Sequence, residues 1–186
     1  SLCDWSSDVC SSDLNPSGNV AGGSFNAVNV NSTNVVSQSE NVLPSTKIGL
    51  FIPIELDSGH VPEGQNIEYS SIPPTSGRHW NSRAECGFYT QSLPDERLVH
   101  NLEHGNIVIS YNLADRSEVT KLRDRLETMV LFEDWGVARP YYKMEEGRVV
   151  LAAWGRIHSM VDVIPVEIES FFTALAGGFG PERIPC

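Results

Sequence analysis

The stretch LPDERLVHNLEHGNIVISY, residues 93–111, decides the fold because it contains a complete junction between a helix and a strand. Pro94 and Asp95 are typical of a helix start, and three apolar residues at helical spacing follow them. Gly105 stands where a helix favours a left-handed residue at its end. The apolar run 107–111 then predicts a buried strand.

Further elements flank this junction on both sides. Before the junction we expect a strand at 48–56, a turn that holds His60, and an ordered Pro- and Gly-rich loop over 61–86. After it we expect a helix from 115 to 129, with Asp115 and Glu118 as a capping box, and strands at 137–142 and 149–157 joined as a hairpin by the turn at 145–147. A last helix follows and is stopped by Gly177 and Gly178. We therefore expect an α+β fold: a single compact domain with helices packed on a mixed or antiparallel sheet.

Length and charge limit the possible functions. The chain has 186 residues, of which 40% are hydrophobic, and this fits one folded domain of ordinary size. Its 13 basic and 24 acidic residues give a formal charge of −11, which argues against nucleic acid as a partner. No apolar run approaches the roughly 18–20 residues of a membrane span. Cations are the partners that this charge favours.

The N-terminal region is not expected to belong to the domain. Residues 4–14, DWSSDVCSSDL, resemble the translation of a sequencing adaptor, so we treat 1–14 as a sequence artefact or a disordered terminus. Residues 15–46 form an Asn-, Ser- and Val-rich arm without Lys or Arg. This extended arm is either a disordered linker or a strand that docks on a neighbouring subunit. The domain itself is expected at 47–186.

Four of the five histidines lie within forty-five residues: His60, His79, His100 and His104. The last two are four apart on the expected helix, so their rings project from one face and can reach one metal ion. Imidazole suits copper, zinc, iron and nickel. Met144 offers a soft thioether that would favour copper over zinc, unless it only fills a gap in the core. Glu103 or Glu96 could hydrogen-bond the far ring nitrogen of a ligand.

The segment HNLEH also fits the H-x-x-E-H pattern of inverted zinc peptidases, in which Glu103 would activate a metal-bound water. Gly105 argues against this alternative, because those enzymes carry the motif within a longer helix. A metal-dependent enzyme therefore stays as an alternative to a binding protein.

Five ordered motifs carry a family resemblance: GHVPEGQNIEYSSIPPTSGRHW at 59–80, CGFY at 86–89, VHNLEHG at 99–105, RPYYKM at 139–144 and LAAWG at 151–155. Together they resemble the bacterial family catalogued as domain of unknown function 3105. The resemblance implies an exported or membrane-anchored, extracytoplasmic domain, with the four histidines on family motif positions. It also implies a disulfide between Cys86 and Cys186, with Cys86 as a metal ligand being the alternative.

These observations predict an extracytoplasmic protein, secreted or on the cell surface, that binds a transition metal through some of His60, His79, His100, His104 and Met144. Copper is the expected ion and zinc the alternative. We also expect the arm to assemble the chain into a homo-oligomer, a cell-surface polymer or filament. The alternative enzyme is a zinc hydrolase with Glu103 as base, or a copper redox enzyme.

Overall fold

The computed structural model describes residues 48–186, so the expectations for 1–14 and 15–46 lie outside the described residues. Its elements are β1 (Leu50–Phe51), β2 (His60–Val61), β3 (His79–Trp80), β4 (Gly87–Phe88), α1 (Asp95–Glu103), β5 (Ile107–Asn112), α2 (Arg116–Glu127), α3 (Val130–Trp135), β6 (Gly136–Pro140), β7 (Arg148–Ala153), β8 (Arg156–Met160) and α4 (Pro165–Leu175). Among these residues, no helix is long and apolar enough to cross a membrane.

A mixed sheet of six strands forms the centre, in the order β1-β8-β7-β5-β6-β4. Strand β6 runs parallel to both β4 and β5, whereas β5–β7, β7–β8 and β1–β8 are antiparallel pairs. A separate two-stranded parallel ladder joins β2 to β3. The expected α+β fold with helices on a mixed sheet is confirmed.

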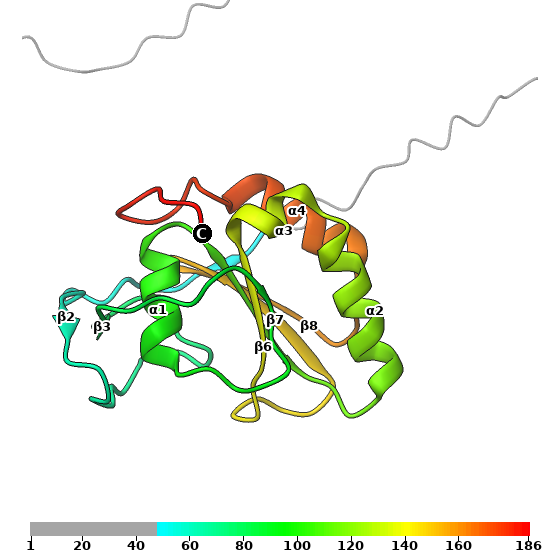
Figure 1. Ribbon diagram of the computed structural model, residues 1–186, viewed down its shortest axis with the longest axis horizontal. Helices are drawn as coiled ribbons and strands as arrows, with labels where there is room; N and C mark the ends of the chain where they lie inside the picture. Colours follow the sequence, from blue (N-terminus) through cyan, green and yellow to red (C-terminus); the bar gives the residue numbers. More distant parts are fainter. Residues whose placement is uncertain (1–47) are drawn as a thin grey trace, which may run out of the picture. The chain divides into compact units, whose positions relative to one another are not determined.

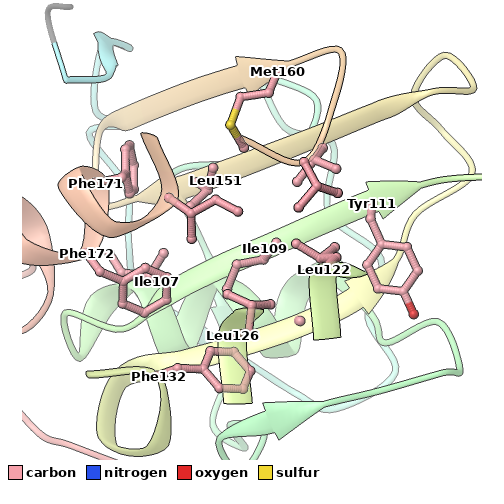
Figure 2. Close-up of a cluster of buried hydrophobic side chains, with 14 of the residues drawn as sticks. Ile107, Ile109, Tyr111, Leu122, Leu126, Phe132, Leu151, Met160, Phe171 and Phe172 are labelled. Carbon is pink, nitrogen blue, oxygen red and sulfur yellow. The ribbon is translucent and has the colours of Figure 1, made fainter. Parts of the chain in front are cut away.

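Helices cover both faces of this sheet (Figure 1). Alternate residues of β5 point to opposite faces, so Ile107, Ile109 and Tyr111 pack in one cluster with side chains of α2, α3 and α4 (Figure 2). Val108 faces the other way and packs with the apolar side of α1. Among the helices of residues 48–186, α1 is therefore the one that covers this face, beside the small ladder β2–β3.

The junction at 93–111 has the expected structure. Pro94 precedes the first residue of α1, and Gly105 follows its last turn with φ of 86°. A side chain at Gly105 would also meet the backbone of Phe179 and Glu182, so a glycine is required there for two reasons.

Three strand predictions are wrong. The run 48–56 forms a strand only at Leu50–Phe51, with one further bond from the amide of Ile52 to the carbonyl of Gly155, and it ends there because Pro53 lacks an amide donor. Residues 149–157 form two strands rather than one, because the chain turns back at Gly155, whose φ is 65°. The strands at 137–142 and 149–157 are not a hairpin, since β5 lies between β6 and β7.

Two local predictions also need correction. The helix expected at 115–129 ends at Glu127, and Met129 instead precedes the separate helix α3. Asp115 caps α2 by accepting from the amide of Ser117, while Glu118 pairs with Lys121. The capping box is therefore not formed. His60 lies in β2 rather than in a turn.

The disulfide between Cys86 and Cys186 is confirmed, with 5.4 Å between the two Cα atoms. It ties the C-terminal tail, residues 177–186, to the loop before β4. The tail also crosses the end of α1, where the amides of Glu182 and Ile184 donate to the carbonyls of Glu103 and His104. These carbonyls would otherwise lack partners at the helix end.

Candidate metal centre

Two local structures bring the histidines together. His100 lies in the last turn of α1 and His104 directly after it, so the two rings are neighbours with centroids 4.6 Å apart. The parallel register of β2 and β3 sets His60 directly opposite His79. Strand β3 packs on α1, which places the pair His60 and His79 beside the pair His100 and His104.

The rings of His60, His79 and His100 form a close triangle. Their centroids are 4.8 Å apart for His60 and His79, and 5.1 Å apart for each of these with His100. One ring nitrogen from each lies within 4.8 Å of the other two. Three nitrogens this close together, contributed by three parts of the chain, could bind one cation.

Backbone carbonyls fix the orientation of two of these rings. Nδ1 of His79 donates to the carbonyl of Gly77 at 2.9 Å, and Nδ1 of His100 donates to the carbonyl of Trp80 at 2.7 Å. With the proton on Nδ1, the neutral ring has its lone pair on Nε2, which is the atom directed at the cluster. A hydrogen bond of this kind on the far nitrogen is typical of metal-binding histidines.

Glu103 adds a carboxylate to the cluster. Its Oε2 lies 2.9 Å from Nε2 of His79 and 3.7 Å from Nε2 of His60. An unprotonated imidazole nitrogen and a carboxylate oxygen repel each other at this distance, so the contact requires a shared proton or a shared cation. Glu103 therefore lies where it could bind the same ion as the histidines.

His104 belongs to a second group, with His100 and Glu103. Arg83 lies 3.4 Å from Nδ1 of His104, and because a guanidinium can only donate, the proton of His104 is on Nε2. That nitrogen lies 3.1 Å from Nε2 of His100 and 3.1 Å from Oε2 of Glu182. His104 is therefore placed to orient His100 rather than to offer a lone pair.

The two groups share His100, whose Nδ1 is already bonded to Trp80. Nε2, which accepts from Nε2 of His104 at 3.1 Å, is thus the one nitrogen of His100 that could bind a cation in place of this hydrogen bond, and it can bind one cation at a time. The arrangement fits one ion per chain.

Burial keeps part of the cluster uncharged. It lowers the pKa of His100, and the neighbouring His79 and His60 lower it further. Burial likewise lowers the pKa of His104, with added effects of His100 and Arg83. Neutral imidazole is the form that binds metals. The side chain of His60 is 49% exposed, so an ion could reach the cluster from this side.

The remaining expected groups lie elsewhere. Met144 follows β6, and its carbonyl accepts from Asn112 at the far end of β5 from His104. Its side chain lines a shallow pocket with Ile72 and Val150 and is not brought to the histidines. Glu96 accepts from the amide of Ile67 and bonds no histidine. The fifth histidine, His158, bonds Glu167 on α4.

Sequence reasoning missed Arg83, Glu182 and the two carbonyls that orient His79 and His100. No spacing rule connects Glu182 with His104, because the contact depends on the course of the tail. The carbonyl of Gly77 had a partial signal, since a Pro- and Gly-rich loop just before a histidine is typical of a rigid ligand support.

Comparisons with known proteins agree with the motifs. No curated protein and no solved structure matches the chain. The model of the family described as "Protein of unknown function (DUF3105)" matches residues 60–186, which include all four clustered histidines and both cysteines of the disulfide. The match spans more than half of the chain, and the protein therefore belongs to the DUF3105 family.

Proposed function

We propose that the domain is an extracytoplasmic protein that binds one transition metal ion through His60, His79 and His100, with Glu103 and His104 beside them. The observation that carries the proposal is the convergence of three ring nitrogens within 4.8 Å, from three segments of the chain. The hydrogen bonds of His79 and His100 to backbone carbonyls support it, because they direct Nε2 of each ring toward the cluster.

Copper is the proposed ion. Among divalent ions of the first transition row, a site of nitrogen ligands binds copper most tightly. Hard ions such as calcium and magnesium need oxygen ligands, and the cluster offers a single carboxylate from Glu103. Zinc is the alternative, since it also accepts three imidazoles.

The Cys86–Cys186 disulfide supports a location outside the cytoplasm. Structural disulfides persist in oxidising compartments and are rare in the cytosol. A domain that meets metal ions from the environment would also be placed there.

Metal analysis tests the proposal. Purified protein is stripped of metal and titrated with Cu²⁺ and, separately, with Zn²⁺, and bound metal per chain is measured by mass spectrometry. We expect one copper per chain. His60→Ala should weaken binding about tenfold or more, because it removes one of three nitrogens while changing a half-exposed side chain.

The matched control is His158→Ala, which removes a histidine that bonds Glu167 outside the cluster. This variant should keep one copper at the affinity of the unaltered chain. Equal copper binding by His60→Ala and His158→Ala would contradict the proposal, as would a chain that binds neither ion.

The proposal includes assembly into a surface polymer through the arm at 15–46. The observation that favours assembly is the sheet edge: β1 is an edge strand, and Leu50, Phe51 and Leu56 nearby are exposed. Exposed apolar side chains at an open strand edge are typical of a site that accepts another strand. Deletion of residues 15–45 should leave a monomer by analytical ultracentrifugation, and assembly that survives the deletion would contradict this part.

A metalloenzyme is the second candidate, favoured by the position of Glu103. A carboxylate 2.9 Å from a ligand nitrogen could take a proton from a metal-bound water. Glu103→Gln would then abolish peptide hydrolysis by the zinc form, or turnover by the copper form, while metal stays bound. Equal turnover in both proteins would reject Glu103 as the base, and absent turnover in the unaltered chain would reject the enzyme and leave the binding protein.

A further inference from the structure

A cleft of about 560 Å³ lies at the start of α1, at the opposite end of this helix from the histidines. Its volume is within the roughly 300–1,000 Å³ of small-molecule sites. The walls come from three segments, which are the loop at 66–67, the residues 92–96 around the helix start, and the residues 139–143 at the end of β6. Trp80 completes the lining.

The polar groups of the cleft are held in fixed positions by a buried charge network. The carboxylate of Asp95 accepts from Arg139, from the hydroxyl of Tyr141 at 3.0 Å and from Nζ of Lys143 at 2.8 Å. Arg139 is 1% exposed, and within residues 48–186 its Nε has no hydrogen-bond partner. A buried ion pair is a costly way to stabilise a fold, since apolar side chains of similar size often do as well. The network therefore fits a binding role.

The charges in the cleft cancel. Asp95 and Glu96 are negative, whereas Arg139 and Lys143 are positive. An anionic ligand would meet two carboxylates in the first turn of α1, and a cationic ligand would meet the guanidinium and the ammonium. The arrangement favours a ligand that is neutral but rich in both donors and acceptors.

The apolar part of the cleft is aromatic. Trp80 and Tyr141 line the cleft as buried residues, whereas Tyr142 is 74% exposed. A large aromatic ring left in water beside fixed polar groups is typical of a surface on which a ligand stacks. The C–H faces of a sugar ring stack on aromatic rings, and its hydroxyl groups both donate and accept hydrogen bonds.

We propose that this cleft binds a neutral saccharide, which stacks on Tyr142 and hydrogen-bonds the polar groups around Asp95 and Lys143. This site lies beyond the proposed metal centre and requires no metal. Trp80 contributes to both sites, because it is one of the residues that line the cleft and its carbonyl orients His100.

The test uses the full chain, stripped of metal, on an array of neutral hexose and N-acetylhexosamine glycans and of glycans with uronic or sialic acids. The tightest-bound neutral glycan is then titrated by calorimetry. We expect saturable binding of a neutral glycan, and at least about tenfold weaker binding by Tyr142→Ala. Phe51→Ala serves as control, since it removes another exposed ring outside the cleft and should bind like the unaltered chain.

Three results would overturn the proposal: no glycan bound, binding confined to acidic glycans, or Tyr142→Ala binding as tightly as the Phe51→Ala control. Because Tyr142 is exposed and no hydrogen bond of its hydroxyl is found among the described residues, its replacement should not unfold the domain. Far-ultraviolet circular dichroism of both variants checks this.

Discussion

Nε2 of His104 lies 3.1 Å from Oε2 of Glu182, so the tail reaches the edge of the histidine cluster. The same tail accepts from Arg83 at the carbonyl of Pro185, and it donates from Glu182 and Ile184 to the carbonyls at the end of α1. These contacts fix the part of α1 that carries Glu103 and His104. The disulfide, next to these contacts, holds the tail in place.

We therefore expect the Cys86→Ser/Cys186→Ser variant to lose both stability and metal affinity. The bond closes a sequence separation of 100 residues, and its removal should lower the free energy of unfolding by about 2–5 kcal/mol. Copper affinity should fall about tenfold, which is typical when support behind a ligand is removed. Urea unfolding and copper titration measure the two effects.

The Glu182→Gln variant separates the carboxylate from the tail that carries it. It keeps the disulfide and the backbone contacts, so its stability should stay close to that of the unaltered chain, while copper affinity falls. If both variants bind copper normally, the tail contributes to stability alone.

Gly180 should be essential for the close approach of the tail to α1. Its φ is 148°, and an added Cβ would lie 2.6 Å from the carbonyl oxygen of Glu103. Gly180→Ala should cost about 1–3 kcal/mol of unfolding free energy, because backbone must move. Gly64→Ala is the matched control: φ is also positive at 90°, but nothing lies within 4 Å. An equal loss in the two variants would mean that backbone strain alone matters.

The sequence predicts what local rules decide. The junction at Pro94, Asp95 and Gly105 follows from helix-end preferences, and the i, i+4 spacing correctly makes His100 and His104 neighbours. The single strand expected at 149–157 is wrong because the apolar run is continuous across the turn. Gly155, with its positive φ, is the local signal for that turn.

Non-local pairing decides the rest of the site. His60 meets His79 through a two-residue parallel ladder, which no sequence period indicates. Strand β5 separates β6 from β7, and Met144, in the connection between them, is thereby carried to the end of β5 that lies away from the histidines. A thioether about 40 residues after the last clustered histidine is therefore a poor guide to a metal ligand when two strands of the sheet lie between them.

Asp95→Asn should destabilise the domain strongly. The change removes a buried carboxylate that accepts from Arg139, Tyr141 and Lys143, and it leaves the buried guanidinium without its counter-charge. Loss of one partner of a buried pair costs about 3–5 kcal/mol. Glu118→Gln, a carboxylate paired with Lys121 on the surface, should change the free energy of unfolding by less than about 0.5 kcal/mol. Similar losses in both variants would contradict the importance of the network.

The same carboxylate predicts how stability depends on pH. Burial alone raises the pKa of Asp95, but Arg139 and Lys143 outweigh burial and hold the pKa below its ordinary value. The folded state therefore binds this proton less readily than the unfolded state, in which the carboxyl has a pKa of about 3.9. The contribution of Asp95 is complete above that pH, and it is lost as the pH falls further, through the pKa of the folded state.

Urea unfolding of metal-free protein at several pH values measures this contribution as the difference between the unaltered chain and Asp95→Asn. Taking the difference cancels the titration of the histidines, which both proteins share. The difference should be constant between pH 7 and about 5 and should shrink below about pH 4. A difference that stays constant down to pH 2, or that grows as the pH falls, would mean that the carboxylate is not stabilised by its two cationic neighbours.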